Sequence, residues 1–131
     1  MQEKNMKKLF YLSWAISLLP LFSFQCSVET LYPEFTGRVE LEGICGRTVV
    51  SVISGDLADL PPNTYAASWQ DPSTGITYQN VFLIANPCQV QRVLRRDDVI
   101  TFRIHPQPDL SCITCMAYSP APIQKLPIEV F

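Results

Sequence analysis

The sequence has little of what catalytic and metal sites require. It contains one histidine, His105, and five glycines among 131 residues. A lone histidine with no catalytic motif around it is usually structural, and we interpret His105 as a strand-end residue facing solvent. No serine lies in a recognisable nucleophile elbow, and the carboxylates suggest no acid–base pair. We therefore expect a protein that is not an enzyme and has no metal or other cofactor.

Basic residues are also too few for a nucleic-acid partner. The chain has 10 Lys and Arg against 12 Asp and Glu, which gives a net charge of −2. The one basic cluster after residue 25, Arg92, Arg95 and Arg96, is followed at once by Asp97 and Asp98. A nucleic-acid-binding protein needs a basic face. The sequence therefore excludes this class of function.

The one long apolar run, "LFYLSWAISLLPLFSF", is short for a membrane span. A transmembrane helix needs about 20 apolar residues, and Pro20 would break a helix near the end of this run. Lys4, Lys7 and Lys8 precede the run, as in the basic region of a signal peptide. We interpret residues 1–25 as a signal peptide and expect an exported protein, with a retained N-terminal anchor helix as the alternative.

Cys26 lies two residues after the end of this run. The segment "FSFQC" resembles the lipobox of bacterial lipoproteins, with Ser23 close to the cysteine and Gln25 in the position that usually holds Gly, Ala or Ser. Relaxed lipoboxes are characteristic of Bacteroidetes-type bacteria. The resemblance implies a lipid on Cys26, a membrane as partner and a location in the cell envelope. The alternative is cleavage by an ordinary signal peptidase near Ser23, which would give a secreted or soluble periplasmic protein.

Cysteine parity favours lipidation. The chain has five cysteines, and an odd number in an exported protein leaves one thiol unexplained. A lipid on Cys26 leaves Cys45, Cys88, Cys112 and Cys115, which can form two disulfides, each contributing about 2–4 kcal/mol. Residues 26–34 would then be a polar tether, and residues 35–131 a single β domain.

The "CITC" motif at Cys112 and Cys115 has the spacing of thioredoxin-type redox motifs and of half a zinc site. A redox motif should begin a helix after a strand, whereas this segment is β-rich and flanked by prolines. A zinc site needs two more ligands at compact spacing, and Cys45 and Cys88 are far apart. We favour structural disulfides in which Cys112 and Cys115 each bond one of these two cysteines, although three connectivities remain open.

Hydrophobic residues alternate with a period of two, which predicts strands rather than helices. In "RTVVSVISG", for example, Val50 and Val52 share one side, and Val49, Ser51 and Ile53 share the other. A proline in the last candidate strand is expected to confine that strand to an edge or place the proline at its start. The pattern predicts an all-β fold, either a small OB-like barrel or a compact sandwich. About six strands are expected, near residues 35–43, 47–55, 64–69, 76–85, 98–105 and 125–131.

Three stretches, "TGRVELEGICGRTVVSV", "VLRRDDVITFRI" and "SCITCMAYSPAPIQKLPIEV", together resemble small exported β-barrel lipoproteins of Bacteroidetes. The matching positions are Cys45 with the glycine after it, the run Asp98 to Phe102, and Cys112 with Cys115. Residues 56–80 have no counterpart. The resemblance covers about two thirds of the mature chain and implies an OB-like barrel. It implies no established activity.

Four aromatic residues, Tyr65, Trp69, Tyr78 and Tyr118, are the best candidates for a binding surface. Exposed aromatics on a rigid β scaffold bind sugars or peptides, although large aromatics are more often buried. We therefore expect a non-catalytic envelope lipoprotein that binds a protein or a glycan. The alternatives are a thiol or redox enzyme using Cys112 and Cys115, and a disulfide-stapled inhibitor or accessory subunit of an exported complex.

We predict that Cys26→Ser releases the protein from membranes into the soluble fraction, with its fold and disulfides intact. The wild type should partition with membranes, because a diacylglyceryl group supplies more hydrocarbon than a single acyl chain, which binds only marginally. Cell fractionation and a thiol count measure both effects. A Cys26→Ser variant that misfolds or shows a new free thiol would identify Cys26 as a disulfide partner instead.

Overall fold

The computed structural model describes residues 32–112 and 118–131, and the predicted signal peptide and most of the predicted tether lie outside these ranges. The described residues form seven strands in one sheet, and their helical content is confined to short 3₁₀ turns. The all-β prediction is therefore confirmed. The strands are β1 (Glu34–Glu42), β2 (Thr48–Ser54), β3 (Ala66–Gln70), β4 (Thr77–Ile84), β5 (Val99–Ile104), β6 (Lys125–Leu126) and β7 (Ile128–Val130).

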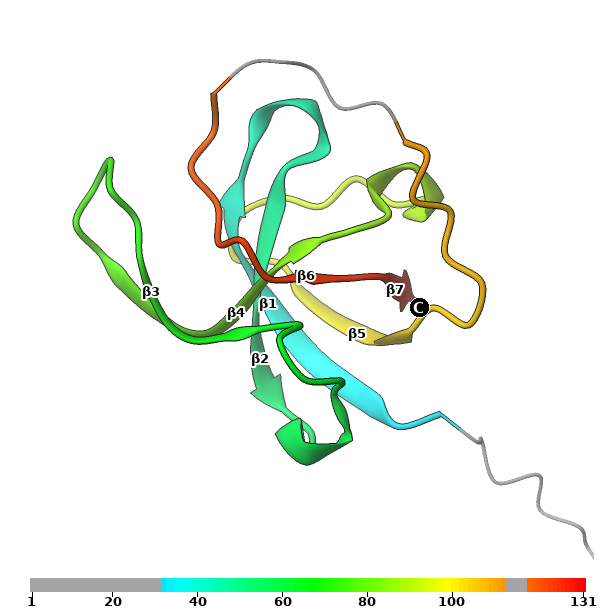
Figure 1. The fold of residues 1–131 in the computed structure, drawn as a ribbon. Coiled ribbons are helices and arrows are strands. Elements are labelled where there is room, and N and C mark those ends of the chain that lie inside the picture. The colour runs from blue at the N-terminus through cyan, green and yellow to red at the C-terminus, as the bar shows by residue number, and fades with distance from the viewer. Residues whose placement is uncertain (1–31, 113–117) are drawn as a thin grey trace, which may run out of the picture.

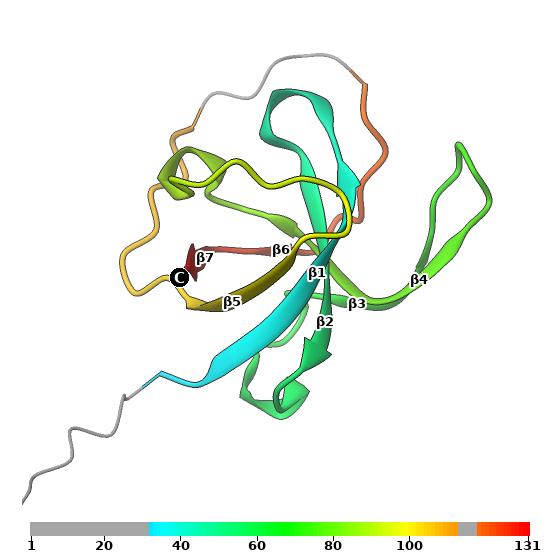
Figure 2. The ribbon, with the colours of Figure 1, turned by 180° about the vertical axis from the view of Figure 1, so that it is seen from behind.

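The sheet closes on itself as a barrel (Figures 1 and 2). Its order is β3-β4-β2-β1-β5-β7, and β6 returns to pair with β4. Since β6 and β7 are consecutive, they act as one strand that joins β4 to β5. The β4–β6 contact is parallel and the other pairs are antiparallel. Around the barrel the strands follow one another as β1, β2, β4, the joined pair β6 and β7, and β5. This order is that of a five-stranded OB-like barrel.

Pro127 lies between β6 and β7, where the chain changes partner from β4 to β5. The sequence predicted an edge strand or a strand start here, and the structure places the proline inside the strand that closes the barrel. Proline has no N–H to donate, so a break between two short ladders accommodates it. Its carbonyl still accepts a hydrogen bond from the backbone N–H of His105 at 3.0 Å.

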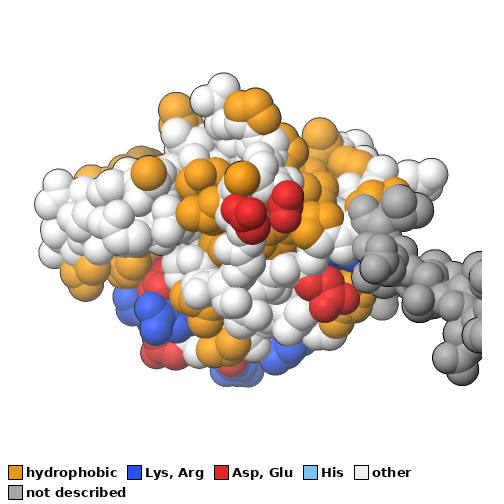
Figure 3. Space-filling view, turned by 90° about the horizontal axis from the view of Figure 1, so that it is seen from below, with side chains coloured by type: hydrophobic (Ala, Val, Ile, Leu, Met, Phe, Trp, Pro, Cys, Tyr) orange, Lys and Arg blue, Asp and Glu red, His pale blue; other side chains and the backbone are white. Residues whose placement is uncertain are grey.

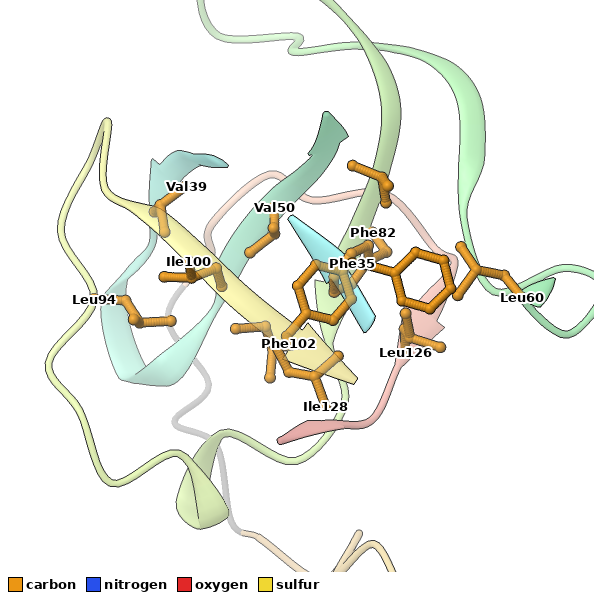
Figure 4. Close-up of a cluster of buried hydrophobic side chains, with 12 residues drawn as sticks. Phe35, Val39, Val50, Leu60, Phe82, Leu94, Ile100, Phe102, Leu126 and Ile128 are labelled. Atoms are coloured by element: carbon orange, nitrogen blue, oxygen red, sulfur yellow. The ribbon is translucent and has the colours of Figure 1, made fainter. Parts of the chain in front are cut away.

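Three phenylalanines fill the barrel (Figure 4). The Phe102 ring lies 5.6 Å from that of Phe35 and 5.5 Å from that of Phe82, measured between centroids. Val50 and Val52 of β2 point into the same core, as their alternation predicts. Gly37 makes this packing possible, because a Cβ there would lie 2.7 Å from the Val50 side chain and 2.9 Å from that of Phe102.

A buried asparagine fastens the closing strand to the barrel. The Asn86 side chain is fully buried just after β4. Its Nδ2 donates to the carbonyl of Ile128 at 3.0 Å, and its Oδ1 accepts from the Ile128 N–H at 2.8 Å. The amide thus takes the place of a neighbouring strand at the residue where β6 has left β4. Buried backbone groups need such partners, so Asn86 completes the closure.

β4 is bent, and its first half leaves the barrel with β3 as a projecting hairpin (Figure 1). The bend is at Asn80, which has a left-handed φ of 52°. β2 pairs with β4 only from Val49 to Ser51, whereas β3 pairs with β4 as far as Thr77. In the hairpin turn, the hydroxyl and amide of Ser73 both donate to Asp71, and these bonds lower the pKa of that carboxyl.

The chain enters the barrel at the end opposite the turn between β1 and β2 (Figures 1 and 2). We call residues 43–47 the first loop and the described residues of 105–124 the proline-rich segment. The first loop lies at the end of the barrel away from residue 32 (Figure 1).

We predict that Asn86→Ala lowers the free energy of unfolding by about 2–4 kcal/mol, because it leaves the buried N–H and C=O of Ile128 without partners. Urea unfolding measures the change. Gln79→Ala, which removes an exposed amide on β4, is the control and should stay within about 0.5 kcal/mol of wild type. Equal effects of the two substitutions would contradict the closing role of Asn86.

Candidate functional site

A groove lies where β2 and β4 separate. Their pairing ends at Ser51 and Val81. Beyond this point β2 continues beside β1 and β4 continues beside β3, so among the described strands the two facing edges pair with nothing. The groove between them has a volume of about 360 Å³. Its lining residues are Arg38, Glu40, Ser51, Val52, Ile53, Thr77, Tyr78, Gln79 and Asn80.

The most buried charged group in the groove is the Glu40 carboxylate, on a residue only 9% exposed. Its Oε1 accepts from the Ser51 hydroxyl at 2.7 Å and from Arg38 Nε at 3.0 Å. No buried side-chain oxygen or nitrogen of the described residues lacks a hydrogen-bond partner. Glu40 Oε2, which receives neither of these bonds, is therefore accessible from the groove. It can accept a hydrogen bond from a ligand.

The sequence singled out neither Glu40 nor its two partners. The alternation in "FTGRVELEG" puts Glu40 on the same face of its strand as Glu42, which the sequence alone suggests is a solvent face. In the structure this face is covered at Glu40, because residues 77–80 of β4 form the opposite wall of the groove. Glu42, two positions on, remains exposed. The covering wall comes from a distant segment, so no local pattern signals it.

The wall contributed by the hairpin is uncharged. Between Ala66 and Asn80 the one charged residue is Asp71, which is 2% exposed. Figure 3 shows the projecting hairpin with only hydrophobic and uncharged polar side chains in that view. Arg96 places a positive charge at the rim of the groove, where its Nη2 lies 3.5 Å from the hydroxyl of Tyr78. The groove thus combines one accessible carboxylate and the Arg38 guanidinium with amide, hydroxyl, aromatic and aliphatic groups.

Three of the four predicted aromatics lie on this side of the barrel. Trp69 and Tyr78 are cross-strand neighbours in the hairpin, and their rings stack with centroids 6.1 Å apart. Tyr118, 81% exposed, lines a cavity together with Trp69. Tyr65 lies apart from them and packs against the main core. The candidate aromatic surface is therefore Trp69, Tyr78 and Tyr118.

We call the cavity shared by Trp69 and Tyr118 the aromatic pocket. It measures about 170 Å³ and lies between the hairpin, the first loop and the proline-rich segment. Arg47 holds the last two together by donating from Nη1 to the carbonyl of Ser119 at 3.0 Å. The lining residues are Arg47, Trp69, Pro72, Tyr118, Ser119, Pro120 and Ala121.

The cysteines are used as structural links. Cys88 and Cys112 form a disulfide with Cα atoms 5.8 Å apart, which confirms the expected pairing of Cys112 with Cys45 or Cys88. Cys45 is also disulfide-bonded. Cys26 and Cys115 lie outside the described residues. Disulfides are typical of oxidising compartments, so the chain belongs outside the reducing cytosol.

Two other site classes find no support in the described ranges. Residues 32–112 and 118–131 contain no group of three or more His, Cys, Asp or Glu side chains that could hold a metal ion. The same residues include no helix long and apolar enough to cross a membrane. His105 follows β5, where its Nδ1 accepts a hydrogen bond from the backbone N–H of Gln107 at 3.1 Å.

Comparisons with known protein families, with curated proteins and with solved structures find no match. The function of the groove is therefore inferred from its own chemistry.

We predict that peptide mapping of the purified protein under non-reducing conditions recovers two bonds, Cys88–Cys112 and Cys45–Cys115. The second is expected because the first loop contacts the proline-rich segment, on which Cys115 lies in sequence. No free thiol should remain when Cys26 carries lipid. A Cys45–Cys26 peptide would contradict both this pairing and the lipid anchor.

Proposed function

We propose that the protein is an exported, lipid-anchored binding module without catalytic activity, and that its groove binds a neutral glycan. The observation that carries the proposal is the accessible oxygen of Glu40, beside the Arg38 guanidinium, in a groove whose opposite wall, residues 77–80, is uncharged. Sugar hydroxyls donate to a carboxylate and accept from a guanidinium such as that of Arg38. The outer strands and loops of OB barrels are a known platform for oligosaccharides.

Charge favours a neutral ligand over an anionic one. Glu40 would repel an anion, and its neighbour Arg38 is already engaged by it at 3.0 Å. The hairpin wall adds no positive charge, and the whole chain has a net charge of −2. An uncharged ligand with many hydroxyl groups meets none of these penalties.

A protein partner is the second candidate, and a specific observation favours it. The unpaired edges of β2 and β4 in the groove could accept an extended peptide as an added strand. Because the two edges diverge, a strand could pair with only one of them. A peptide strand bonded to one edge would leave most polar side chains of the groove without contact to the ligand. A glycan would bind more of these side chains, so we favour the glycan. Thiol chemistry at Cys112 and Cys115 loses support, because Cys112 is bonded to Cys88.

The location in the cell envelope rests on the N-terminal segment. The basic residues, the short apolar run and Cys26 support export and lipidation. The resemblance to exported β-barrel lipoproteins of Bacteroidetes supports the same assignment. Cysteine parity also agrees, since a lipid on Cys26 leaves an even number of cysteines for disulfides.

We predict that the wild-type domain binds neutral glycans in an array and that Glu40→Ala weakens this binding by at least about tenfold, since hydrogen bonds to a charged group contribute about 1.5–3 kcal/mol. Glu40→Gln should weaken it less, because the amide oxygen still accepts. Glu42→Ala is the matched control, as it removes an exposed carboxylate from the same strand, and it should leave affinity unchanged. Absence of glycan binding, or equal losses for Glu40→Ala and Glu42→Ala, would contradict the proposal.

A further inference from the structure

The aromatic pocket has a chemistry different from that of the groove. Its lining contains no carboxylate and consists mainly of rings from Trp69, Pro72, Tyr118 and Pro120. The Tyr118 ring is largely open to solvent. Such a pocket offers apolar faces and one guanidinium, whereas the groove offers hydrogen-bonding groups. The two cavities are therefore suited to different parts of one ligand or to two different ligands.

The stacked pair Trp69 and Tyr78 links the two cavities. Tyr78 lines the groove and Trp69 lines the aromatic pocket, while their rings contact each other across β3 and β4. The cavities therefore adjoin the same aromatic pair. A ligand that leaves the groove over Tyr78 next meets Trp69.

The pocket wall opposite the hairpin is held in place before any ligand arrives. Arg47 donates to the Ser119 carbonyl at 3.0 Å, next to Tyr118, and Cys112, farther back in the same segment, is bonded to Cys88 in the 3₁₀ turn after β4. Tyr118 thus lies next to a residue that is fixed to the first loop. Less conformational entropy is lost when a ligand binds to such a surface.

We propose that the ligand is an oligosaccharide rather than a single sugar, with one unit in the groove and a neighbouring unit against Trp69 and Tyr118 in the aromatic pocket. This inference rests on the proposed glycan function and names the length of the ligand. A chain of sugar rings repeats hydroxyl edges and apolar C–H faces, which match the groove and the pocket in turn. Linking two units makes the second contact intramolecular, so affinity rises with chain length.

The test is titration calorimetry with the purified mature domain. The probes are cello-, chito-, malto-, manno- and xylo-oligosaccharides of one to six units. At least one series should bind the wild type with affinity that rises by about tenfold or more from monomer to hexamer. Tyr118→Ala should remove most of that rise and leave monomer affinity unchanged, and Trp69→Ala should also remove it. Tyr32→Ala, which removes a partly exposed tyrosine at the other end of the barrel, is the control and should keep the full rise.

The outcomes separate this inference from the function on which it rests. Binding that is lost in Glu40→Ala but does not depend on chain length overturns the inference alone. A length dependence that Tyr118→Ala leaves intact also overturns it, and this variant changes an exposed loop side chain, so its folding is not at risk. Failure of all five series to bind overturns both. Binding of an extended peptide in the groove, with no sugar able to displace it, would overturn the glycan function and this inference together. Strand addition would then be the function of the groove.

Discussion

Closure of the barrel between β4 and β5 is the interaction on which the rest of the structure depends. The strand that closes it is divided by Pro127, so neither half alone pairs with both neighbours. At Ile128, where β6 no longer pairs with β4, the Asn86 side chain bonds the N–H and the C=O of the backbone. Closure brings Leu126 and Ile128 into the buried cluster that contains Phe102 and completes the core. It also commits the second half of β4 to the barrel, which leaves the first half free to form the hairpin and open the groove.

Local sequence patterns predict the strands well because alternation is a local property. Val50 and Val52 face the core and Ser51 faces outward, as the period of two requires. The partner change at Pro127 and the role of Asn86 follow from contacts between segments far apart in sequence. A proline in a strand predicts an edge when only its missing N–H is considered. In the structure Pro127 lies between β6 and β7, and the Asn86 amide bonds the next residue, Ile128, so the proline creates no edge there.

The candidate site was predictable in part. Trp69 and Tyr78 were recognised as aromatics, and their stacking follows from a hairpin register that the turn between them sets. Tyr65 shows the limit, because its position beside the same strand gave no indication that its ring packs on the main core. Glu40 shows another limit. Its outward direction was evident from alternation, but its burial depends on the bend at Asn80, where a non-glycine residue adopts a left-handed φ.

The position of β6 and β7 between β4 and β5 also determines when the domain can fold. These strands follow all the others in sequence, yet they lie between two that are made earlier. A nascent chain that still lacks residues 125–130 has an open sheet and an incomplete core, and its closing contacts are among the most non-local in the molecule. Folding must therefore wait for this segment.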